Sequence, residues 1–106
     1  MLSLDPSSSQ GERPEARRLT GAADLKTFCF SIQASAEPGV MPRVLHLFAK
    51  RNLVPERWVS GVDGQGGLTI DLQVTGLDAQ LTGYIARCLG QLAYVERVLT
   101  SEKAGQ

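Results

Sequence analysis

One segment, residues 28–51, constrains the fold more than any other part of this chain. Apolar and polar residues alternate up to residue 34, which is the period of a strand with one buried face. A short loop at residues 36–39 follows, and apolar residues then recur at the three- and four-residue spacing of an amphipathic helix. The chain must therefore turn directly from a strand into a helix that packs back onto the same sheet.

The remaining patterns extend this strand–loop–helix unit. Residues 53–62 are extended, residues 63–67 form a glycine-rich turn, and residues 68–74 alternate strictly, which predicts a hairpin that Thr75-Gly76 ends. A helical stripe that includes Tyr84 runs from Leu77 to Leu92, and residues 94–100 form a last strand. The order β-α-β-β-α-β predicts an α+β, ferredoxin-like sandwich. Its four-stranded antiparallel sheet has strand order 4-1-3-2, with both helices on one face.

Composition separates one folded domain from two ends. Residues 1–23 combine three consecutive serines, two prolines and mixed charges with few apolar residues, so we expect a disordered N-terminal arm. We expect the domain to span residues 24–101 and residues 102–106 to fray. No continuous apolar run suggests a secretory signal or a membrane anchor, and Cys29 and Cys88 lack the spacing of a paired site. These features favour a cytoplasmic protein with reduced cysteines.

Charge and residue types argue for a binding module rather than an enzyme. Eleven basic and eleven acidic residues balance, which gives no support to a nucleic-acid partner. His46 is the only histidine, so it has no second histidine with which to build a metal or catalytic site. Asp63 and Asp71 are expected in a turn and on an exposed strand, not as an acid–base pair. We therefore expect no catalytic residue, metal or cofactor.

The loop between the first strand and the first helix is the main candidate site. Gly39 is expected to adopt a positive φ and to leave backbone amides open at the helix N-terminus, where a carboxylate can bind. A plain strand-to-helix connector accounts for the same residues, and from the residues alone it is the simpler interpretation.

Residues 36–52 resemble the start of the ACT domain, a small regulatory module that senses amino acids. An E-P-G loop at residues 37–39 precedes an arginine, an aliphatic stripe and a basic helix end. Within the family, this segment is most similar to the small subunit of acetolactate synthase, and residues 89–98 are similar to that subunit's passage into its last strand. The resemblance covers about residues 27–101. Ala36 departs from it, because those small subunits usually carry asparagine there.

The resemblance implies a non-catalytic regulator in branched-chain amino-acid biosynthesis, with a catalytic large subunit as its partner. It also implies a homodimer, because ACT-type ligands lie between two modules, against this loop and the neighbour's first helix. The backbone amides of Gly39 and Val40 would hold the carboxylate of a small amino acid, and Met41 would line its side-chain space. The full expected ligand-binding set is Ala36, Glu37, Pro38, Gly39, Val40 and Met41.

The second strand is the expected oligomer interface. Pro55 cannot donate a hydrogen bond to a neighbouring strand, which favours a position at the sheet edge. An uncovered edge invites pairing with a second copy. Trp58 is a reasonable interface anchor, although core packing is its commoner use, and Arg57 is a weaker candidate.

Two alternatives share this topology. A single-stranded RNA-binding module needs exposed aromatic residues on the central strands and a basic groove. An acyl-phosphate hydrolase needs an arginine-bearing phosphate cradle in the first loop, where this chain has Glu37. Both alternatives are weaker than an interaction module of the ACT type.

Overall fold

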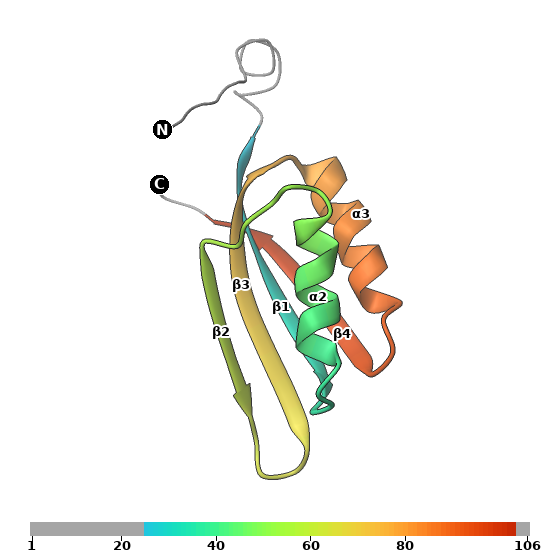
Figure 1. Ribbon diagram of the computed structural model, residues 1–106. Helices are drawn as coiled ribbons and strands as arrows, with labels where there is room; N and C mark the ends of the chain where they lie inside the picture. Colours follow the sequence, from blue (N-terminus) through green and yellow to red (C-terminus); the bar gives the residue numbers. More distant parts are fainter. Residues whose placement is uncertain (1–24, 104–106) are drawn as a thin grey trace, which may run out of the picture.

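The computed structural model describes residues 25–103 (Figure 1). The N-terminal arm expected over residues 1–23 and the last three residues lie outside the described part. The elements are β1 Lys26–Ser35, α2 Val40–Ala49, β2 Arg57–Val62, β3 Gly67–Leu77, α3 Ala79–Gly90 and β4 Val95–Glu102. Neither helix within residues 25–103 is long and apolar enough to cross a membrane.

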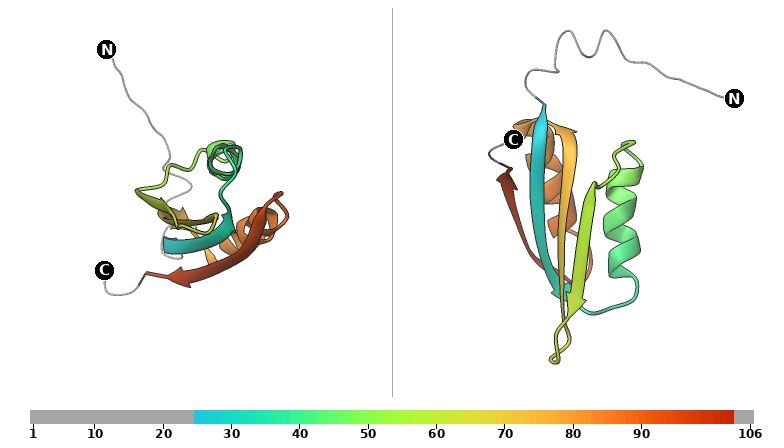
Figure 2. Two further views of the ribbon diagram at one scale, coloured as in Figure 1. Left: turned by 90° about the horizontal axis from the view of Figure 1, so that it is seen from below. Right: turned by 90° about the vertical axis from the view of Figure 1, so that its left-hand side faces the viewer.

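The predicted topology is confirmed. The four strands form one antiparallel sheet in the order β2-β3-β1-β4, so β2 and β4 are its edges. Both helices cover the same face, and the sheet and helices form two layers (Figures 1 and 2). The opposite face of the sheet carries no element of the described chain.

The core lies between the two layers and follows the alternation seen in the sequence. Phe30 of β1 and Phe48 of α2 meet edge to face, with ring centroids 5.3 Å apart. Thirteen further apolar side chains are buried around them: Phe28, Ile32, Ala34, Val40, Val44, Leu47, Leu68, Ile70, Leu72, Val74, Leu77, Ile85 and Leu89. Burial of each large side chain contributes about 1.5–3 kcal/mol before chain entropy is counted.

The transition from β3 to α3 differs from the expectation. Thr75-Gly76 does not end the strand, because β3 continues to Leu77 through a bulge. Gly76 has a φ of 96° and no partner in the register, since Leu77 pairs with Lys26 and Thr75 pairs with Thr27. A glycine in this conformation is typical of such bulges. Leu77 is therefore a buried strand residue, not part of the helix.

The buried face of α3 is rotated relative to the predicted stripe. Tyr84 was expected on that stripe but is 45% exposed, whereas Thr82, Ile85 and Leu89 are buried. Successive helical residues are about 100° apart, so the burial of Ile85 turns the preceding Tyr84 towards the helix flank.

The ends of three elements also refine the sequence interpretation. β2 begins at Arg57, so Pro55 lies before the strand rather than within it. β4 continues through Glu102, and the Lys103 N–H donates to Thr27 O at 2.8 Å, where fraying was expected from residue 102. After α2, the C-cap Lys50 is right-handed, and Asn52 two residues later has a φ of 60°, a left-handed conformation that asparagine tolerates.

Candidate functional site

The loop between β1 and α2 is held in place by bonds to distant parts of the chain. The Ala36 N–H donates to Gly66 O, in the turn of the β2–β3 hairpin, at 2.9 Å. The Ser35 N–H donates to Tyr94 O, just before β4, also at 2.9 Å. Loop and hairpin turn consequently lie at the same end of the molecule, the lower end in Figure 1.

A pocket of about 210 Å³ lies between this loop and the end of the hairpin. Four predicted ligand-binding residues line it, together with two hairpin residues that sequence reasoning missed. The lining is Ala36, Glu37, Pro38, Met41, Val62 and Leu68. Val62 and Leu68 are register partners, at the end of β2 and the start of β3. The hairpin itself was predicted, but nothing local in the sequence indicates that its end meets the loop.

Gly39 does not have the predicted conformation. It is the N-cap of α2 with a φ of −80°, in the ordinary right-handed region, so no positive φ requires a glycine here. Its missing side chain instead leaves room for Arg43, because a Cβ on Gly39 would lie 2.8 Å from Nη1 of that arginine.

The amide of Val40 is not open either. The Val40 N–H donates to Glu37 O at 3.1 Å, and its side chain belongs to the core. The expected pair of ligand-holding amides from Gly39 and Val40 is therefore wrong for Val40. Among residues 25–103, no side chain caps the start of α2, so none of them neutralises its positive dipole end in that way.

The expected interface residues are not brought together. β2 is an edge strand, as predicted, but neighbouring strand residues point to opposite faces of a sheet. Trp58 packs partly buried against the core on the helix side. Arg57 lines a hollow on the open face of the sheet, which is the face without helices, and Pro55 precedes the strand.

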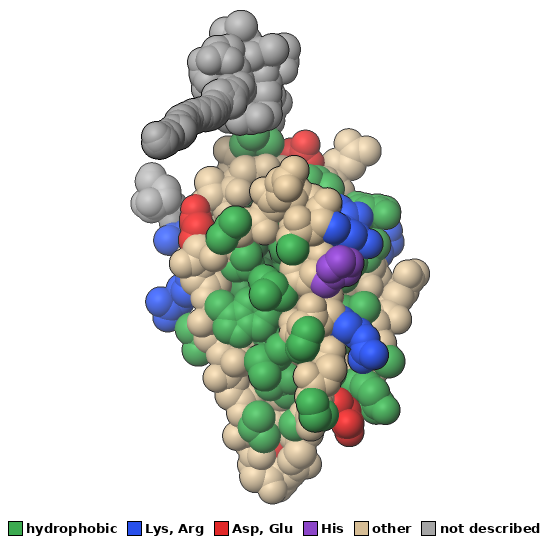
Figure 3. All heavy atoms as spheres, viewed as in Figure 1, with side chains coloured by type: hydrophobic (Ala, Val, Ile, Leu, Met, Phe, Trp, Pro, Cys, Tyr) green, Lys and Arg blue, Asp and Glu red, His purple; other side chains and the backbone are tan. Residues whose placement is uncertain are grey.

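Apolar side chains flank β2 on the helix side. We call Met41 and Leu45 of α2, with Trp58 and Val62 of β2, the β2 strip. Leu45 is 46% exposed and Val62 is 65% exposed, whereas Met41 and Trp58 are half-buried. Met41 and Val62 also line the loop pocket, so the strip continues into it. Hydrophobic side chains gather over α2 and the neighbouring strands in Figure 3.

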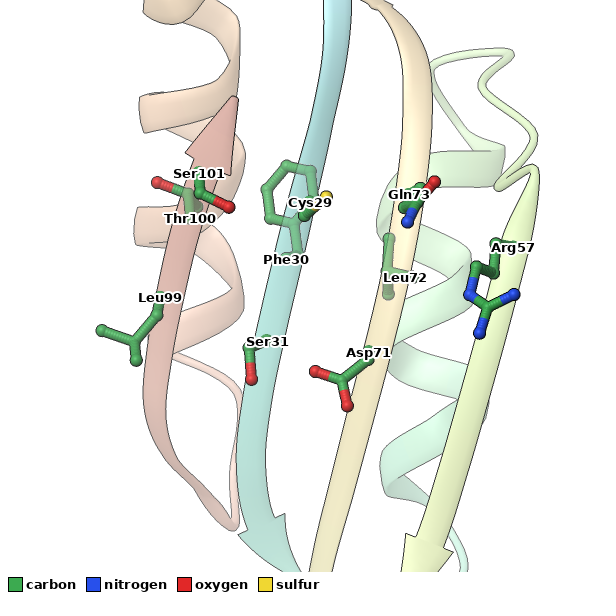
Figure 4. Close-up of a pocket in the computed structure, with 10 residues that line it drawn as sticks. All are labelled: Cys29, Phe30, Ser31, Arg57, Asp71, Leu72, Gln73, Leu99, Thr100 and Ser101. Carbon is green, nitrogen blue, oxygen red and sulfur yellow. The ribbon is translucent and has the colours of Figure 1, made fainter. Parts of the chain in front are cut away.

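A second and larger hollow, of about 610 Å³, lies on the open face of the sheet (Figure 4). Its polar side chains include Ser31 and Asp71 from the two central strands and Arg57 from β2. Phe30 is the aromatic residue in the lining, but it is 1% exposed and its ring packs on Phe48 in the core, so it offers no exposed stacking surface for a base. Within residues 25–103, no group of three His, Cys, Asp or Glu side chains is placed to hold a metal ion.

A family model for the ACT-like domain matches residues 22–105, most of the chain. The chain belongs to the ACT-like family. ACT domains are small regulatory modules that bind amino acids, commonly dimerise and occur in enzymes. A comparison with curated proteins found no matching sequence.

Solved structures share the fold of this ACT-like chain. The ACT domain of a GTP pyrophosphokinase from Chlorobium tepidum is 13% identical with a TM-score of 0.64, over 73% of this chain and 99% of that chain. An uncharacterised protein from Thermotoga maritima is 20% identical with a TM-score of 0.61, over 74% and 96%. A homoserine dehydrogenase from Thiobacillus denitrificans is 14% identical with a TM-score of 0.62, over 74% of this chain but only 17% of the enzyme.

Proposed function

We propose that this ACT-like chain is a non-catalytic regulatory module that binds a small amino acid at a site shared by two copies. The observation that carries the proposal is the continuity between the loop pocket and the apolar β2 strip at the sheet edge. A pocket that opens on an uncovered edge is completed when a second copy covers that edge.

The pocket lining supports an amino acid with an aliphatic side chain. Met41, Val62 and Leu68 supply apolar surface, and Glu37 is the one charged residue in the lining. A carboxylate at that position forms a charge-assisted hydrogen bond with the ammonium group of an amino acid. The uncapped positive end of α2 favours the carboxylate group of the same ligand.

The dimer proposed here pairs β2 with β2 of the second copy. Two four-stranded sheets would then join into one, and the β2 strip of each copy would be covered. Pro55 lies before β2 and so leaves the backbone N–H groups of the strand itself available. Sedimentation of the full chain should give a dimer, and Val62→Lys should give a monomer. A monomeric unmodified chain at high concentration would contradict the shared site.

The enzyme partner we propose is the catalytic large subunit of acetolactate synthase, which places the chain in branched-chain amino-acid biosynthesis. The support is the similarity of residues 36–52 and 89–98 to the small subunits of that enzyme. Adding this chain to the purified large subunit should raise its activity. An unchanged rate at saturating chain concentration would remove this partner while leaving the amino-acid site untouched.

Calorimetric titration of the full chain with single amino acids tests the ligand site. Valine, leucine or isoleucine should give heat at millimolar concentration, and Met41→Asp should abolish it. Leu99→Asp is the matched control, because Leu99 is 51% exposed and lines the hollow on the opposite face of the sheet. Flat traces for all amino acids would contradict the sensing function.

A further inference from the structure

The side of α2 that faces away from the β2 strip is chemically different from the strip. Basic side chains come from both helices and from the turn after α2, and one exposed tyrosine lies among them. We call this set the basic helix face: Arg43, His46, Lys50, Arg51, Tyr84 and Arg87. Figure 3 shows Lys and Arg side chains over the helices, with Asp and Glu only towards the ends of this side of the molecule.

This charge has no counterpart in the helices themselves. Residues 40–51 and 79–90 contain no Asp or Glu. Asp78, the nearest acidic residue of α3, uses its side chain to accept the Leu81 N–H at 2.7 Å. Lys50, Arg51 and Arg87 lie near helix C-termini, where cations stabilise the helix, but Arg43 lies in the first turn of α2, where a cation is unfavourable. Helix stability therefore does not explain the whole set.

Tyr84 brings two of the arginines together. The guanidinium carbon of Arg51 lies 5.0 Å from the centre of the tyrosine ring, and that of Arg87 lies 5.9 Å from it. Arg51 is held further by the bond from Nη1 to Leu47 O at 3.0 Å. A hollow of about 340 Å³ lies beside Tyr84 and Arg87, and its other lining residues are Asp78, Gln80 and Leu81. The Asp78 carboxylate there is already engaged by the Leu81 N–H. Both guanidinium groups thus gather at one ring, and Arg87 also lines a space that admits a side chain.

We propose that the basic helix face docks an acidic segment of a partner protein, whose carboxylates bind Arg51 and Arg87. Tyrosine and arginine are the residue types that dominate protein interfaces, and guanidinium groups bind carboxylates in a two-pronged geometry. A second copy does not fit, because a twofold contact would bring the same cations together. The arginines already occupy the Tyr84 ring and the chain as a whole carries no net charge, which favours a protein segment over single-stranded nucleic acid.

This inference rests on the proposed function in one respect, that a regulatory module must contact the protein it regulates. Arg51 and Arg87, which carry the proposed docking, do not line the loop pocket. Loss of amino-acid binding and loss of partner docking can therefore be measured independently.

The test is an NMR titration of the full chain with three probes. The first is a short peptide of alternating Glu and Leu, the second is the same peptide with Gln for Glu, and the third is an oligothymidylate of equal charge. The acidic peptide should shift resonances of Tyr84 and Arg87, and its affinity should fall as salt is added. The Gln peptide should not bind there. Arg51→Gln/Arg87→Gln should weaken the acidic peptide about tenfold or more.

The matched control is Arg97→Gln/Lys103→Gln, which removes the same charge from exposed positions on and after β4. It should leave the affinity for the acidic peptide within about twofold. The single variant Arg87→Gln, at an exposed position, guards against a folding defect from the loss of the Arg51 bond. Equal weakening in both double variants, shifts confined to the β2 strip, or tighter binding of the oligothymidylate would each overturn the proposal.

Discussion

The two helices begin in different ways. The start of α3 is capped by a neighbouring residue, because the Asp78 carboxylate accepts the Leu81 N–H. The preceding Leu77 is fully buried and anchors this end of the helix. α2 begins at Gly39 without a side-chain cap, and the loop before it is held by backbone bonds to Gly66 and Tyr94, far away in the sequence. The start of α3 has a side-chain acceptor, whereas the start of α2 has none and its loop is positioned by bonds to distant residues.

This difference separates stability from binding. A side-chain cap occupies an N–H of the first helical turn, which is then not free to bind a ligand. An uncapped start beside a pocket keeps its positive dipole end available, at a cost that the rest of the fold must offset. We therefore expect substitutions around α3 to change the free energy of unfolding, and substitutions around the β1–α2 loop to change ligand binding.

The largest effect should come from Leu89→Ala in α3. Leu89 is fully buried in the core, so its truncation leaves a cavity and should lower the free energy of unfolding by about 2–5 kcal/mol. Urea denaturation measures this loss. Leu81→Ala is the comparison, because Leu81 is only half-buried and should cost clearly less. An equal cost at both positions would mean that the buried face of α3 is not the one described.

Removal of the Asp78 cap should have the next largest effect. Asp78→Ala leaves the Leu81 N–H without its acceptor and should destabilise the protein by about 1 kcal/mol. Asp78→Asn keeps an acceptor oxygen and should recover most of that loss. The comparison of the two helix starts fails if Asp78→Ala changes amino-acid binding at the loop pocket more than it changes stability.

Thr82 offers a change in the opposite direction. Its Oγ1 is buried and has no hydrogen-bond partner within the described part of the chain. Thr82→Val replaces this hydroxyl with a methyl group of similar shape and should raise the free energy of unfolding by about 1 kcal/mol. Thermal denaturation of Thr82→Val and Thr82→Ser checks the cause, because serine keeps the hydroxyl and should not stabilise.

The sequence predicted the architecture well because alternation and helical spacing are local signals. The strand order and the buried faces of β1 and β3 followed from such patterns. The errors arose where the deciding contact is distant or depends on helix rotation. Gly39 leaves room for Arg43 rather than adopting a positive φ. Tyr84 is exposed because the next residue of the helix, Ile85, occupies the buried face.

The loop side of the candidate site was predicted from the sequence, and the hairpin side was not. Residues of the loop were identified from their own sequence, but Val62 was missed because it reaches the pocket only through the hairpin. The hydrogen bond from the Ala36 N–H to Gly66 O holds the loop against the hairpin turn, and no residue pattern near Ala36 predicts this bond. The inference from Pro55 failed for a related reason. β2 begins at Arg57, after Pro55, so the missing N–H of the proline does not affect the pairing of the strand.

The smallest predicted effect is a pH dependence of the hairpin turn that supports the start of α2. Asp63 Oδ1 accepts the Gln65 N–H at 2.7 Å and the Gly67 N–H at 2.9 Å. The hydrogen bond from Gly67, and after it that from Gln65, lowers the pKa of Asp63 below its ordinary value of 3.8. Because the folded state favours the ionised carboxylate, the stabilisation is complete above about pH 4 and is lost as the pH falls through the lowered pKa.

Carbon-detected NMR of the Asp63 carboxyl group measures that pKa directly. Acid should loosen the turn and, through Gly66, the Ala36 amide, so protection of Ala36 from hydrogen exchange should fall below pH 4. Protection of Leu92, which follows α3 and donates to the backbone oxygen of Leu89 at 3.1 Å, should stay unchanged. Asp63→Asn, which cannot ionise, should show no such fall. If Asp63 titrates at or above 3.8, or if both amides lose protection together, the start of α2 does not depend on the hairpin as described.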